Sequence, residues 1–110
     1  MSFAIRKHGE VCVVDVEGQL IVGNRQELKQ KVLDEVERGE RKFLIDFSQT
    51  GYIDSSGLGV LVSLSKKIRE AGGELRLANL NDDLKTLFEL TKLDTLFQIS
   101  STREDALSSF

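Results

Sequence analysis

From residue 11 onward the chain alternates between strand-like and helix-like segments, and no other feature limits its fold as strongly. Short runs rich in apolar and β-branched residues predict strands at 11–17, 42–47, 74–78 and 96–99. Apolar residues at helical spacing predict helices that begin near Asn24, Asp54, Asn81 and Thr102. Because strand–helix–strand units favour parallel pairing, we expect an α/β domain: a small mixed sheet of four to five strands, packed by about four helices.

A strand-like run at 3–7 precedes this pattern and is expected to form a hairpin with the strand at 11–17. Side chains alternate between the two faces of a strand, so Cys12, Val14 and Val16 share one face. We expect that face of the second strand to be the buried one.

The sequence also predicts the structure of the connection to the first helix and the cap of that helix. Residues 18–23 are bounded by glycines and are expected to form a loop. Asn24 and Glu27 have the spacing of a capping box, in which the side chains satisfy free N–H groups at the start of a helix.

Composition narrows the possible functions. With 15 basic and 18 acidic side chains the formal net charge is −3, which argues against a nucleic-acid-binding face. One cysteine and one histidine exclude a metal site built from several such ligands. No apolar run reaches the roughly 18 residues of a membrane span, and the N-terminus lacks a signal peptide's apolar core. We expect a single cytoplasmic domain, 1–110, with no metal, cofactor, nucleic acid or membrane partner.

The most unusual stretch follows the predicted strand at 42–47 and opens a predicted helix. It reads Asp54-Ser55-Ser56-Gly57-Leu58-Gly59, with two hydroxyls between an acid and two glycines. Asp and Ser satisfy the free N–H groups of a helix N-terminus, and the helix dipole there stabilises added negative charge. Two interpretations follow. In the first, the stretch has no role beyond capping the helix; in the second, Ser55 is a phosphate acceptor, with Ser56 as the alternative acceptor.

Two catalytic interpretations of the stretch are weak. A serine nucleophile needs a base, but His8 is the only histidine and falls in the predicted hairpin turn, and the Gly-x-Ser-x-Gly pattern is absent. A dinucleotide-binding loop needs a third glycine where Val62 stands. We expect no catalytic residue and no enzymatic activity.

The same stretch resembles the signature of STAS domains of the bacterial anti-sigma factor antagonist family. Further resemblances lie at Gly18-x-Leu20, at 72–75 and at 87–97, so the likeness covers about residues 3–108. It implies that Ser55 is phosphorylated by a partner that is both an anti-sigma factor and an ATP-using serine kinase. The unphosphorylated form would bind this partner and free a sigma factor, and a serine phosphatase would reset the cycle.

The resemblance also implies a partner-binding surface, made of Ile21, Val22, Asp54, Ser55, Ser56, Gly57, Leu58 and Gly59. We expect the protein to be a monomer or weak dimer. Ile21 stands where many family members have aspartate. Ile21 and Val22 either tuck into the core or widen an apolar docking patch for a different partner. Alternative roles are a STAS scaffold or a ligand-sensing module in another signalling or secretion pathway, without sigma-factor control.

Overall fold

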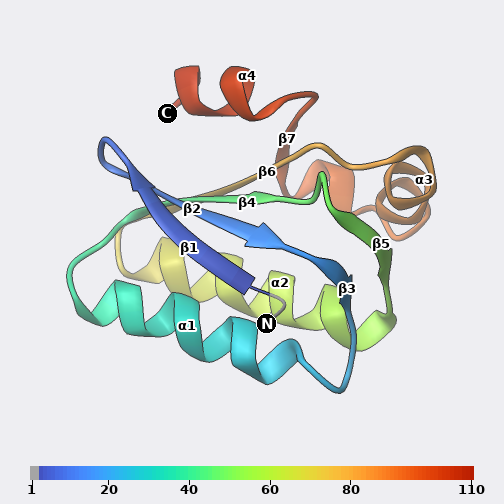
Figure 1. Ribbon diagram of the computed structural model, residues 1–110, viewed down its shortest axis with the longest axis horizontal. Coiled ribbons are helices and arrows are strands. Elements are labelled where there is room, and N and C mark those ends of the chain that lie inside the picture. Colours follow the sequence, from blue (N-terminus) through green and yellow to red (C-terminus); the bar gives the residue numbers. More distant parts are fainter. Residues whose placement is uncertain (1–2) are drawn as a thin grey trace.

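The computed structural model describes residues 3–110, so Met1 and Ser2 of the expected domain lie outside the described part. Its main sheet has five strands in the order β1-β2-β4-β6-β7 (Figure 1). The strands are β1 (Phe3–His8), β2 (Val11–Val16), β4 (Lys42–Asp46), β6 (Glu74–Ala78) and β7 (Gln98–Ser100). β1 runs antiparallel to β2, whereas β2, β4, β6 and β7 are parallel to one another. The expected mixed α/β sheet is confirmed.

The larger core lies between the sheet and two long helices, α1 (Arg25–Glu37) and α2 (Ser55–Glu70), which cover one face (Figure 1). Cys12, Val14 and Val16 of β2 face this core, as the alternation in the sequence predicts. They belong to the same core cluster as Leu61 and Leu64 from the buried stripe of α2. Burial of this apolar surface is the main free-energy term that holds the helices to the sheet.

The expectation that only one face of β2 is buried is wrong. Val11 and Val13 are 6% and 2% exposed, and they form a second core with Leu44, Ala78 and Ala106. Ala106 belongs to α4 (Arg103–Ser108), which crosses the opposite face of the sheet (Figure 1). The C-terminal helix therefore supplies the cover that the strand pattern alone did not reveal.

Residues 18–23 do not form only a loop, as the sequence suggested. β3 (Gly18–Leu20) pairs in parallel with β5 (Thr50–Ile53), and together they form a separate two-stranded sheet. Leu20 is fully buried in the core. A three-residue strand carries too little alternation to be recognised from sequence.

The capping box expected at Asn24 does not form. The Asn24 side chain makes no cap hydrogen bond to α1; its Oδ1 accepts from the Ile21 N–H at 2.9 Å, and its Nδ2 donates to the Gln19 carbonyl at 2.8 Å. Asn24 thus closes the turn between β3 and α1 instead of accepting a hydrogen bond from a free N–H group of the helix.

The remaining expected caps are confirmed. Asn81 accepts from Leu84 at the start of α3 (Asp82–Leu90), and Thr102 accepts from Asp105 at the start of α4. After α3, the short helix η1 (Leu93–Thr95) leads to β7. The strand expected at 96–99 starts later, because Phe97 is buried edge-to-face against Phe88 before pairing begins.

Among residues 3–110, no helix combines the length and apolar character that crossing a membrane requires.

Candidate functional site

The carboxylate of Asp54 organises the junction between β5 and α2. Its Oδ1 accepts hydrogen bonds from the Gly57 N–H at 2.8 Å and from the Ser56 hydroxyl at 2.7 Å. These bonds, with that of Ser56 the larger contribution, lower the pKa of Asp54 below its ordinary value. Asp54 is therefore an ionised N-cap at neutral pH, as its residue type predicts.

Asp54 also attaches a second segment to this junction. Its Oδ2 accepts from the Val22 N–H at 3.1 Å, which holds the turn after β3 beside the start of α2. The Val22 side chain is 65% exposed, whereas Ile21 is half-buried. The sequence left open whether this pair packs into the core or lies on the surface. The structure places Val22 on the surface next to the serines, and only Ile21 is partly inside.

The two serines differ in their surroundings. Ser55 is exposed, and the structure gives its hydroxyl no hydrogen bond to residues 3–110. Ser56 is half-buried and donates its hydroxyl proton to Asp54. Of the two, Ser55 is therefore the hydroxyl that an incoming group can reach without breaking an existing contact.

The glycines and Leu58 of the motif do not all face outward. A Cβ on Gly57 would lie 2.5 Å from the Leu20 carbonyl oxygen, so this glycine lets α2 pack directly on β3. Leu58 is 7% exposed and belongs to the core. Gly57 therefore accommodates the protein's own β3 strand, and its expected place on the partner-binding surface stays a prediction. Gly59 is exposed with open space around it.

Two exposed apolar side chains near the motif were missed by the sequence reasoning. Val62 is 36% exposed and lies seven residues after Ser55, so Ser55, Gly59 and Val62 share one face of α2. Tyr52 of β5 is 57% exposed. The helical spacing from Ser55 to Val62 in the sequence could have predicted that Val62 lies on the same face as Ser55. We call Val22, Ser55, Gly59 and Val62 the docking surface.

The arrangement lacks the parts of a serine hydrolase. The chain's single histidine, His8, ends β1 at the hairpin, and Figure 1 shows this hairpin at the opposite end of the fold from the start of α2. The carboxylate beside the serines is engaged as a helix cap. What the site offers is an exposed hydroxyl on a helix N-terminus, where added negative charge is favoured.

One cluster elsewhere has the residue types of a metal site. The Cys12 thiol and the Glu35 and Glu40 carboxylates lie within 4.8 Å of one another. Glu40 is paired with Lys7 and Glu35 with Arg38. Burial, aided by the charge of Glu40, raises the pKa of Cys12 to about 11, so the thiol stays protonated and is a poor ligand.

Known proteins resemble this chain over most of its length. The profile of the STAS domain family matches residues 2–106. The anti-sigma-B factor antagonist of Bacillus subtilis is 34% identical over 91 residues, covering 83% of each chain. BtrV of Bordetella bronchiseptica, named as a candidate anti-sigma factor antagonist, is 27% identical over 110 residues, covering 100% of this chain and 95% of BtrV.

A solved structure agrees with these sequence relatives. The crystal structure of a candidate anti-sigma factor antagonist from Thermotoga maritima has a TM-score of 0.92 and 29% identity, and the match covers 97% of this chain and 92% of that one. The family profile, the sequence relatives and the fold agree over nearly the whole chain. The chain therefore belongs to the STAS domain family, among the bacterial anti-sigma factor antagonists.

Proposed function

We propose that this protein is an anti-sigma factor antagonist whose binding is switched by phosphorylation of Ser55. In the unphosphorylated state it binds a partner that is both an anti-sigma factor and a serine kinase, and this binding frees a sigma factor. The observation that carries the proposal is the exposed Ser55 hydroxyl on the N-terminus of α2. The names of the Bacillus and Thermotoga relatives support the class of partner.

The position of Ser55 explains how a phosphate can act without unfolding the protein. The N-terminus of α2 presents free N–H groups and the positive end of the helix dipole, which tolerate a phosphate. Ser55 is exposed, so the group displaces no core side chain. Phosphorylation is therefore expected to leave the fold intact and to change only the surface.

The docking surface explains why the same phosphate weakens binding. Val22 and Val62 are exposed apolar side chains, and Gly59 leaves the backbone of α2 open to close approach. A dianionic group added among them would have to be desolvated at the centre of an interface. We expect this to cost about 1–3 kcal/mol of binding free energy, or about tenfold to a hundredfold in affinity.

The rest of the cycle follows from the same proposal. A serine phosphatase would remove the phosphate from Ser55, and the chain would act as a substrate and switch with no catalysis of its own. Its proposed partners and their ATP are found in the bacterial cytoplasm, so the proposal places this chain there as well, as a monomer or weak dimer.

Phosphate transfer tests the assignment to Ser55. Wild type, Ser55→Ala and Ser56→Ala are incubated with the cognate kinase and ATP, and phosphate is located by mass spectrometry of peptides. We expect one phosphate on wild type and on Ser56→Ala, and none on Ser55→Ala. Full labelling of Ser55→Ala would refute the assignment. Circular dichroism of each variant controls for the loss of fold.

A further inference from the structure

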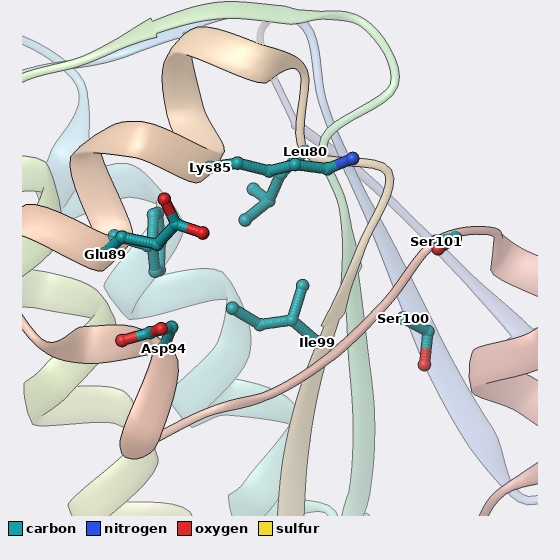
Figure 2. A pocket seen from close by; sticks show the side chains of 8 residues that line it. Leu80, Lys85, Glu89, Asp94, Ile99, Ser100 and Ser101 are labelled. Atoms are coloured by element: carbon teal, nitrogen blue, oxygen red, sulfur yellow. The ribbon is translucent and has the colours of Figure 1, made fainter.

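A small pocket lies at a different part of the molecule from the docking surface. It has a volume of about 300 Å³ and is formed by α3, η1 and the ends of β6 and β7 (Figure 2). Leu80 follows the carboxyl end of β6, and Ser100 ends β7. Small ligands of open parallel α/β sheets commonly bind beyond the carboxyl ends of the strands. The volume falls at the small end of the range of ligand sites.

The floor of the pocket is apolar. It is lined by Leu80, Phe88 and Ile99, of which Phe88 is fully buried and Leu80 is 6% exposed. Phe88 is held by its edge-to-face contact with Phe97, with ring centroids 6.1 Å apart. The floor is therefore preformed by core packing, which favours an apolar ligand body.

The rim of the pocket carries opposite charges on opposite sides. Figure 2 shows the carboxylates of Glu89 and Asp94 on one side and the Lys85 ammonium group on the other, the side that holds Ser101. Within residues 3–110, none of these three charged groups has an ion-pair partner within 4 Å. Lys85 and Glu89 are four residues apart on α3, but their charged ends lie apart at the opening.

From this arrangement we infer that the pocket binds a small zwitterion with an apolar body, of which a free apolar amino acid is the simplest. Glu89 and Asp94 complement its ammonium group, and Lys85 complements its carboxylate, with the hydroxyl-bearing Ser101 on the same side of the pocket. The apolar side chain rests on Leu80 and Ile99. A simple cation would leave Lys85 unmatched, and a simple anion would face two carboxylates.

This inference does not rest on the proposed switch at Ser55. The charged groups of the rim are exposed to water, which screens them, so we expect weak binding in the millimolar range. Binding of that strength suits the sensing of a metabolite that is abundant in cells.

Ligand titrations followed by nuclear magnetic resonance test the inference. The ¹⁵N-labelled chain is titrated with L-leucine, with 4-methylpentanoate, which lacks the ammonium group, and with isoamylamine, which lacks the carboxylate. L-leucine is expected to shift the amide signals of Leu80, Ile99 and Ser101 saturably. Each analogue is expected to bind at least about tenfold more weakly, because one charged contact is lost.

Variants on the rim supply the matched controls. Lys85→Gln and Glu89→Gln are each expected to weaken L-leucine binding by about tenfold, whereas Lys66→Gln on the exposed side of α2 leaves it unchanged. All three positions are exposed, so the variants are expected to fold. The inference is overturned if L-leucine gives no saturable shifts at the pocket, if an analogue binds as tightly as L-leucine, or if the rim variants bind it like wild type.

Discussion

Gly57 and Gly59 stand two positions apart on α2 and meet opposite surroundings. Gly57 faces β3, where any side chain would collide with the Leu20 carbonyl, and Gly59 faces open solvent. Helical spacing places Gly57 on the apolar stripe with Leu61 and Leu64, and Gly59 on the other face with Val62. What the sequence does not reveal is that β3 approaches Gly57 so closely that a Cβ has no room there. Residue chemistry did predict that Asp54 caps the helix, since that contact is local.

Alanine substitutions separate the two glycines. Gly57→Ala is expected to lower the free energy of unfolding by about 1–3 kcal/mol, because its Cβ needs space that backbone atoms occupy. Gly59→Ala is expected to raise it by about 0.5–1 kcal/mol, because alanine is the better helix former and nothing obstructs it. Urea denaturation of both variants measures the difference. Equal effects of the two substitutions would contradict these assignments.

Thiol labelling tests burial at Cys12 and exposure at Ser55 with one reagent. Cys12 is fully buried with its pKa raised to about 11, so it is expected to react only when the protein opens. A Ser55→Cys variant in a Cys12→Ala background is expected to react at the rate of a free thiol or faster, because a helix N-terminus favours the thiolate. Fast labelling of Cys12 in native wild type, or protection at position 55, would contradict the structure.

At the scale of elements, α4 is attached to the sheet by a charged cluster that the sequence did not reveal. Arg103 of α4 donates to Asp46 through Nε at 2.7 Å and also pairs with Asp15. Burial alone would raise the pKa of Asp46, but hydrogen bonds from the Ser48 N–H, Arg103 and Asn79 together outweigh it and lower that pKa. The partners are up to 88 residues apart in sequence, so no local pattern predicts them.

Acid unfolding tests this attachment. Because the pKa of Asp46 is lower in the folded state than in the unfolded chain, its stabilising effect is complete above about pH 4 and is lost as the pH falls through the folded-state value. Asp46→Asn is expected to lower the free energy of unfolding by about 1–3 kcal/mol at pH 7. The deficit relative to wild type should shrink toward pH 3.

Urea denaturation between pH 7 and pH 3 measures that deficit. Glu37→Gln removes the same charge from an exposed position on α1 and serves as the control, with little expected effect. A deficit for Asp46→Asn that stays constant over this pH range would show that the Asp46 charge does not stabilise the fold.

Elements with strong periodicity or local caps were predicted from the sequence, and short or tertiary-dependent ones were not. α2 begins close to its predicted position because the cap formed by Asp54 is a local contact. β3 and β5 were missed because their pairing is made between residues more than thirty positions apart. The same pairing brings Val22 to Ser55, so that half of the candidate site could not be predicted from the motif alone.

At the scale of the whole molecule, the docking surface and the charged attachment of α4 lie on different sides of the fold. α1 and α2 cover one face of the sheet, and α4 crosses the other (Figure 1). A phosphate on Ser55 therefore adds charge away from the Asp46–Arg103 pair. We therefore expect the proposed switch at Ser55 to alter the surface and not to loosen the fold.

The most direct test of the central claim uses wild type and Ser55→Asp as paired baits in lysate of the source organism, with retained proteins quantified by mass spectrometry. Ser55→Ala is the control for loss of the hydroxyl, and equal thermal midpoints confirm intact folds. We expect wild type and Ser55→Ala to retain a serine kinase with anti-sigma activity. Ser55→Asp is expected to retain at least about tenfold less of that kinase. Equal retention of that kinase by wild type and Ser55→Asp would contradict the claim and leave Ser55 without a role in partner binding.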